Sequence, residues 1–161
     1  MAIAALICLS GWSLPGQTSR SASGGSQDRE IAKVVIKSPA VAKRGQSLTI
    51  PVEVKVAKGF HVTSATPGDR YLKPLQISWD KGALVAEATR YPEAVLRSYP
   101  FAEGKLSVLE GAFVIEQQFR VPANATQGFG AITGKLRYQA CTERECFAPA
   151  TVPIQFSYDI R

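Results

Sequence analysis

The chain of 161 residues is 45% hydrophobic and 20% charged, a composition that excludes a disordered protein and is typical of a globular domain. A chain of this length buries about two thirds of the surface that its unfolded form exposes, so one domain can form a core without a metal or a disulfide. The formal net charge of +6 does not indicate a nucleic-acid binder, because Lys and Arg alternate with Asp and Glu and form no basic stripe.

The N-terminal segment has the pattern of an export signal. Residues 1–9 form an apolar run that is too short to span a bilayer, so residues 1–22 are predicted to be a signal-like segment and the start of a linker. Residues 23–30 continue as a Ser/Gly-rich linker, and residues 31–161 form the folded domain. Ile7 is not the small residue that a lipid-anchor site requires before its cysteine, so we expect Cys8 to leave with the signal and the protein to be periplasmic or otherwise exported.

From residue 31 onward the pattern predicts β-strands throughout. The expected strands cover residues 31–37, 47–56, 59–63, 75–79, 84–89, 111–121, 131–141 and a last one that starts near 146 or 152 and ends at 158. Alternation is clearest at Leu48, Ile50, Val52 and Val54, and no long window has a helical period. Seven to nine short strands predict an all-β fold, a single-domain immunoglobulin-like antiparallel β-sandwich of two packed sheets.

Residues 91–110 break the strand pattern. Their apolar residues are irregularly spaced, and Pro92, Pro100 and Gly104 interrupt them. We interpret this segment as a long functional loop or flap, because unstructured loops of this length usually bind or cover something. The alternative is a solvated connection.

Cys141 and Cys146 are the two cysteines that remain once the signal is removed. An even number of cysteines in an exported chain favours a disulfide. The four residues between them suit a hairpin loop, in which facing residues have Cα atoms about 4.5 to 5.5 Å apart. That spacing allows a bridge with little backbone movement.

Such a bridge would stabilise the fold only weakly. Closing a loop of about six residues removes about 2 kcal/mol of unfolded-chain entropy, whereas a loop of about sixty residues would remove about 4 kcal/mol. This difference favours redox chemistry over reinforcement. The alternative stays open: a non-catalytic immunoglobulin-like interaction module with a structural hairpin disulfide.

The residues around the cysteines leave the reactivity of the thiols open. Arg137 and Arg144 favour a thiolate, while Glu143 and Glu145 oppose it. The single histidine, His61, is a candidate proton acceptor if the fold brings it to the hairpin, and otherwise a structural residue. Two cysteines and one histidine are too few for a four-ligand zinc site, so we expect no metal and no cofactor.

Several short motifs resemble the N-terminal domain of the DsbD family of thiol:disulfide interchange proteins. The most specific is Tyr138-Gln-Ala-Cys141, followed by Cys146-Phe-Ala-Pro149. Weaker elements occur in the same order upstream: Gly59-Phe-His-Val62, Thr66-Pro-Gly-Asp69, Leu72-Lys-Pro-Leu75 and Leu106-Ser-Val-Leu-Glu-Gly111. The resemblance covers residues 30–158.

The resemblance implies an immunoglobulin-like periplasmic domain that passes electrons from a thioredoxin-like donor to oxidised periplasmic proteins. Cys146 would form the mixed disulfide with the partner, and Cys141 would resolve it. Phe101, with Tyr99, would shield the disulfide as a cap, and Tyr138 joins His61 as a possible supporting residue. The chain ends at Arg161 without the family's membrane and thioredoxin-like domains, so we expect it either to receive electrons from a separate protein or to have kept the fold and lost this electron transfer. We also expect a monomer without a transmembrane helix.

Overall fold

The computed structural model describes residues 31–161, so the predicted signal, Cys8 and the linker lie outside the described residues. The described part consists of strands joined by turns, and it contains no helix long and apolar enough to cross a membrane. The strands are β1 (Ala32–Ile36), β2 (Ala40–Ala42), β3 (Ser47–Val56), β4 (His61–Thr63), β5 (Gln76–Trp79), β6 (Val85–Arg90), β7 (Val95–Ser98), β8 (Lys105–Glu110), β9 (Ala112–Arg120), β10 (Gly128–Tyr138), β11 (Ala140–Cys141) and β12 (Ala150–Ile160).

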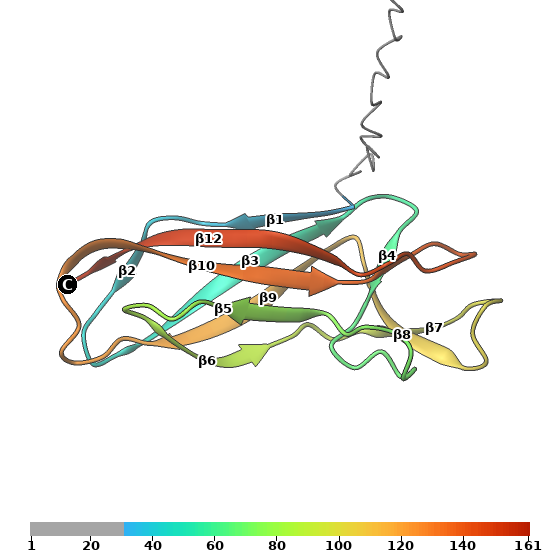
Figure 1. Ribbon diagram of the computed structural model, residues 1–161, viewed down its shortest axis with the longest axis horizontal. Coiled ribbons are helices and arrows are strands. Elements are labelled where there is room, and N and C mark those ends of the chain that lie inside the picture. Colours follow the sequence, from blue (N-terminus) through green and yellow to red (C-terminus); the bar gives the residue numbers. More distant parts are fainter. Residues whose placement is uncertain (1–30) are drawn as a thin grey trace, which may run out of the picture.

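These strands form three sheets of four. Two of them, in the orders β1-β3-β9-β6 and β2-β12-β10-β5, make up the sandwich, and the third has the order β11-β4-β8-β7. The third sheet lies at one end of the elongated molecule, and the C-terminus lies at the other (Figure 1). The prediction of an all-β sandwich is therefore confirmed, with a further small sheet at one end.

The alternation expected for residues 47–56 is present in β3. Its inward side chains Ile50, Val52 and Val54 are buried, and their neighbours in sequence point outward. β3 pairs antiparallel with β9, where Val52 lies opposite the fully buried Ile115. The period of two therefore places one face of each strand in the core.

An aromatic cluster joins the two sheets of the sandwich. Trp79 of β5 lies edge-on to Phe119 of β9 at 5.2 Å and to Phe156 of β12 at 5.6 Å between ring centroids. Phe119 and Phe156 are also edge-on, at 5.5 Å. Such T-shaped contacts add to the burial of large apolar surface, so the centre of the sandwich is stabilised far from either cysteine.

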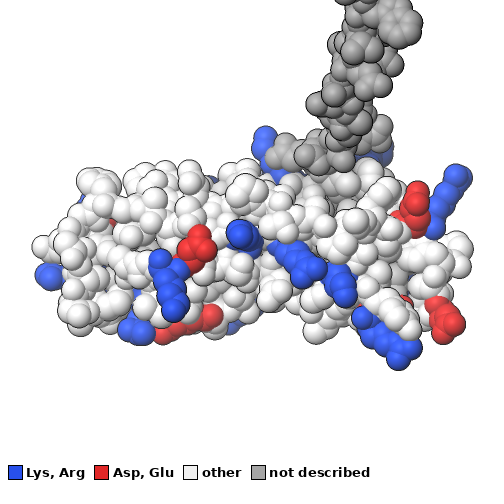
Figure 2. Space-filling model, in the orientation of Figure 1, with Lys and Arg blue, Asp and Glu red and all other residues white. Residues whose placement is uncertain are grey.

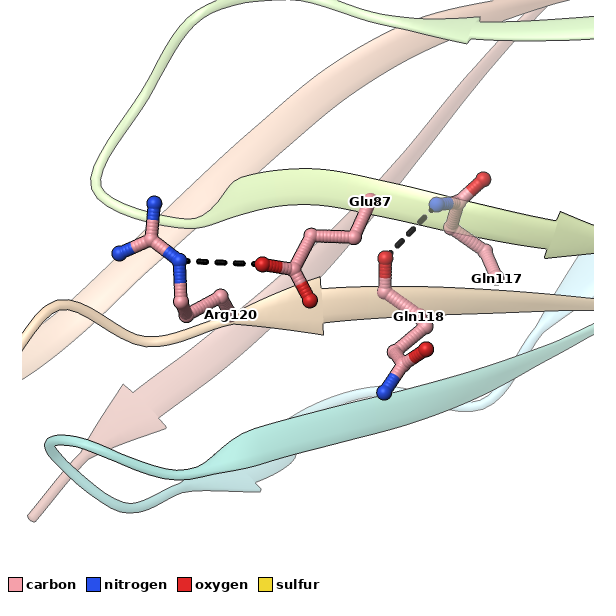
Figure 3. A network of polar contacts seen from close by, with 4 residues as sticks. All are labelled: Glu87, Gln117, Gln118 and Arg120. Carbon is pink, nitrogen blue, oxygen red and sulfur yellow. Dashed lines mark hydrogen bonds and ion pairs between the residues drawn. The ribbon is translucent and has the colours of Figure 1, made fainter.

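A buried glutamine fills an irregularity at the sheet edge. The register between β6 and β9 shifts between Ala86 and Thr89. There, the Gln117 amide nitrogen donates to the carbonyls of Ala88 (3.3 Å) and Gln118 (2.8 Å), and its oxygen accepts from the Thr89 hydroxyl (2.7 Å). Figure 3 shows Gln117 on β9, together with the ion pair between Arg120 of β9 and Glu87 of β6. The side chain thus replaces the hydrogen bonds that the shift disrupts.

The structure corrects the sequence analysis at three points. Residues 91–110 are not a long loop, because they contain β7 and β8, which pair as a hairpin closed by residues 99–104. The short strand β2 was not predicted, and it pairs parallel with β12, so that sheet is not purely antiparallel. Within residues 31–161, twelve strands in three sheets replace the expected seven to nine strands in two.

Charged residues are interspersed over the face drawn in Figure 2. Lys and Arg occur along most of its length, with Asp and Glu among them. The ion pairs Arg90–Glu116 and Arg97–Glu110 lie at exposed positions, where each contributes little to stability. This pattern agrees with the mixed charge order of the sequence.

Candidate functional site

The two cysteines form a disulfide at the end of the third sheet. Cys141 ends β11, and Cys146 faces it as an antiparallel bridge residue across a four-residue turn. The Thr142 amide donates to the Glu145 carbonyl at 2.8 Å, and the Thr142 hydroxyl accepts from the Arg144 amide at 3.3 Å. The pairing and the hairpin are as predicted, with a Cα–Cα distance of 3.9 Å that is shorter than expected for a regular strand pair.

The two sulfur-bearing residues differ in exposure. Cys141 is fully buried, at 0%, whereas Cys146 is only partly buried. Of the four residues between them, Glu143 to Glu145 are exposed and Thr142 is partly buried. A molecule that approaches this end of the protein therefore reaches Cys146 before Cys141.

The ladder of the third sheet places His61 between Cys141 and an acidic residue. Cys141 lies opposite His61 in the β11–β4 pair, and His61 lies opposite Glu110 in the β4–β8 pair. Directly opposite residues of antiparallel strands project from the same face of a sheet. Cys141, His61 and Glu110 therefore form one row across three strands.

Two aromatic rings stack on His61, the middle residue of this row. His61 stacks on Tyr99 with centroids 4.4 Å apart and planes within 14°, and Tyr99 stacks on Phe101 at 5.3 Å. We call residues 99–104 the cap loop, and the buried residues Tyr99, Leu106 and Val108 the cap cluster. Tyr99 is 5% exposed and Phe101 is 38% exposed, so the outermost ring of the stack is Phe101.

Burial and two carboxylates set the protonation of the stacked groups. Burial lowers the pKa of His61, and Glu143 and Glu110 oppose this by raising it. Burial raises the pKa of Tyr99 to about 12; the same two carboxylates add to the rise, and Arg97 opposes it. Both rings are therefore uncharged near neutral pH.

A glutamine that the sequence analysis did not single out clamps the hairpin. The buried Gln139 donates from its side-chain nitrogen to the Phe147 carbonyl at 2.9 Å, and its oxygen accepts from the Lys73 amide at 2.7 Å. The Phe147 amide also donates to the Ala140 carbonyl at 2.8 Å. In the sequence, the only sign of this role is the position of Gln139 in the Tyr138-Gln-Ala-Cys141 motif, directly before the strand that carries Cys141.

Two neighbours of the site were also missed. The Phe147 ring, directly after Cys146, packs against Phe60 at 6.0 Å, and Phe147 is 39% exposed. A hollow of about 420 Å³ lies beside them and is lined by Phe60, His61, Glu110 and Glu143, among others. Within residues 31–161, no three His, Cys, Asp or Glu side chains are grouped so that they could hold a metal ion.

The candidate residues named from the sequence thus fall into two groups. Cys141, Cys146, His61, Tyr99 and Phe101 come together on the third sheet and its loops. Tyr138 is buried at the end of β10, where it belongs to the core of the sandwich rather than to the cap cluster.

Comparisons with known proteins bear on the fold. The structure is similar to the N-terminal periplasmic domain of ScsB from Proteus mirabilis, with a TM-score of 0.60 and 14% identity over 80% of this chain and 47% of that chain. This chain therefore spans about half the length of the ScsB domain. A family 123 glycoside hydrolase from Clostridium perfringens has a TM-score of 0.42 at 15% identity, over 81% of this chain and 27% of that one, too weak a likeness to support an argument. No family model matches the sequence, and no curated protein matches it significantly. The likeness to the ScsB domain shows a shared fold.

Proposed function

We propose that this protein is a thiol–disulfide exchange domain whose active pair is Cys141 and Cys146. One observation carries the proposal: the disulfide closes a short hairpin in which Cys141 is buried and Cys146 is partly exposed. Exchange needs one sulfur that a partner can reach and a second that is held beside it. The fold shared with a periplasmic domain of ScsB and the resemblance of the cysteine motifs to the DsbD family support the same proposal.

The reduced protein would act in two steps. The Cys146 thiolate attacks one sulfur of the partner's disulfide, which forms a mixed disulfide and releases the partner's other sulfur as a thiolate. The Cys141 thiolate then attacks the Cys146 sulfur, which restores the intramolecular disulfide and releases the partner's second sulfur. Two electrons pass to the partner, which ends as a dithiol.

The cap loop would control access to the pair. Tyr99 is buried against His61, the ladder neighbour of Cys141, and Phe101 covers Tyr99. We propose that these two rings shield the disulfide and move aside when a partner docks. Removing the outer ring by Phe101→Ala is then expected to increase the rate at which a phosphine or a dithiol reduces the disulfide.

The proposed partners are a thioredoxin-like electron donor and oxidised proteins of the periplasm. The resemblance to the DsbD family suggests both classes, and the periplasmic source of the ScsB domain agrees with an exported site of action. We propose that the domain works as a monomer and as one component of a reductase system.

Trapping of mixed disulfides tests the proposal directly. A Cys141→Ala variant keeps the attacking cysteine but cannot resolve, so it should accumulate disulfide-linked partners that a reductant releases. A Cys146→Ala variant is the matched control and should trap few or none. If neither variant traps a partner, and the reduction potential of the domain lies below about −300 mV, the disulfide is structural and the protein is an interaction module.

A further inference from the structure

His61 has a buried nitrogen that the fold leaves without a protein partner. The residue is 3% exposed, and no group of residues 31–161 hydrogen-bonds its Nε2 atom. A buried polar atom without a partner costs about 1 to 3 kcal/mol. Such a cost is often tolerated where the atom has a chemical task.

The position of His61 suggests that task. It lies directly opposite Cys141 in the β11–β4 pair, and both side chains are buried on the same face of the third sheet. Stacking on Tyr99 fixes the plane of the ring. A neutral imidazole thus lies on the strand next to Cys141, the more buried of the two cysteines.

We propose that His61 accepts the thiol proton of Cys141 in the resolving step. This inference rests on the proposed function. As Cys141 attacks the Cys146 sulfur of the mixed disulfide, its proton moves to the His61 imidazole and the partner's thiolate departs. The imidazolium then gives the proton to that thiolate or to water, so the protein ends with a neutral histidine and an intact disulfide.

The surroundings of His61 fit this role. Burial keeps the imidazole neutral and ready to accept a proton, because it lowers the pKa of the ring. Glu110 on β8 and Glu143 in the cysteine turn raise that pKa, so they would stabilise the imidazolium once it forms. Tyr99 on the cap loop stays neutral, with its pKa raised to about 12. The hollow lined by His61 and both carboxylates provides a route to solvent.

A two-phase reaction with an aromatic disulfide separates the roles of the two cysteines. The reduced protein is mixed in stopped flow with 5,5′-dithiobis(2-nitrobenzoate), which releases one coloured thiolate when Cys146 attacks and a second when Cys141 resolves. His61→Phe keeps a ring to stack on Tyr99 but has no basic nitrogen. We expect it to leave the first phase within about twofold and to slow the second by about tenfold or more at pH 7.

The pH profile distinguishes proton transfer from a loss of packing. In His61→Phe, the rate of the second phase should rise about tenfold per pH unit until the Cys141 thiol titrates, because only the free thiolate reacts. The wild-type rate should level off once His61 is neutral. Val62→Ala, which shortens a buried side chain on the same strand, is the matched control and should keep the wild-type profile.

Each outcome has one meaning. If the first phase is absent in the wild type, the proposed function fails, because Cys146 does not attack. If both phases are present and His61→Phe changes neither the rate nor the profile of the second, the inference about His61 is wrong and the proposed function stands. His61→Gln, which has a hydrogen-bonding amide but no base, must slow the second phase too, and it serves alone if the Phe variant does not fold.

Discussion

Reduction of the Cys141–Cys146 disulfide should lower the free energy of unfolding by only about 2 kcal/mol. The bridge joins residues five apart in sequence, so the loop contains about six residues, and the entropy that it removes from the unfolded chain is worth about 2 kcal/mol at 25 °C. A folded region of about 130 residues unfolds with an entropy of about 0.27 kcal/mol per kelvin. The midpoint of thermal unfolding should therefore fall by about 7 °C.

The stabilisation of about 2 kcal/mol also determines how easily the disulfide is reduced in the folded protein. By linkage, a bridge that stabilises the fold by about 2 kcal/mol has a reduction potential only about 45 mV lower in the folded than in the unfolded chain. Urea unfolding of the oxidised protein and of the same protein kept reduced with dithiothreitol measures the difference. A loss of about 4 kcal/mol or more, or unfolding on reduction, would show that the fold depends on the bridge and would refute this reasoning.

Three further predictions concern the stability of the sandwich and the buried His61. Gly134→Ala should lower the free energy of unfolding by about 3 kcal/mol, because the added methyl would collide with the carbonyl oxygen of Ser78, whereas Gly104→Ala enters open space and should change it by less than about 0.5 kcal/mol; urea unfolding compares the two. Gln117→Leu should cost about 2 kcal/mol in the same assay, because it leaves the carbonyls at the β6 shift without their donor. For His61, burial lowers the pKa in the folded state below 6.5. As the pH falls through 6.5, His61 therefore binds a proton more readily in the unfolded chain than in the folded protein. Stability should decrease there by up to about 1.4 kcal/mol per pH unit, and His61→Phe should remove this part of the pH dependence in urea unfolding at pH 5 and 7.5. A variant with an unchanged slope would show that His61 does not titrate differently in the two states.

Strands with one buried face and clear alternation could be predicted from sequence, whereas the β7–β8 hairpin could not. β3 shows its period of two because only Ile50, Val52 and Val54 face the core. β8 has no such alternation in its sequence, because both of its faces are partly buried. Val108 belongs to the cap cluster, while its neighbour Leu109 belongs to the core of the sandwich. Consecutive buried residues in β8 look like an irregular apolar run, and β7 is exposed throughout. Together with Pro92, Pro100 and Gly104, this gives the segment the sequence pattern of a loop.

The candidate site was predictable only as far as local contacts determine it. The disulfide pairing follows from a four-residue spacing on one hairpin, which is a local property. The contact between Cys141 and His61 depends on strands that are 80 positions apart in sequence, and no local pattern reports it. Gln139 lies within the Tyr138-Gln-Ala-Cys141 motif, but the sequence does not show its role, because its hydrogen bonds to Lys73 and Phe147 arise only when two loops meet.

Under the proposed function, one chain has to combine a stable sandwich with a disulfide that opens, and the division into a large core and a small cap cluster would allow both. Trp79, Phe119 and Phe156 join the two large sheets through ring contacts that involve neither cysteine. The cap cluster has only three buried residues, so its local opening requires far less free energy than unfolding of the sandwich. Leu109 anchors β8 in the core of the sandwich, and this anchor would let Tyr99 and Phe101 move with residues 99–104 while the strand beneath them stays in place. Under the proposed function, a local movement of the cap loop would uncover His61 and the buried Cys141 on the neighbouring strand. The row of Cys141, His61 and Glu110 would stay in place for the second step.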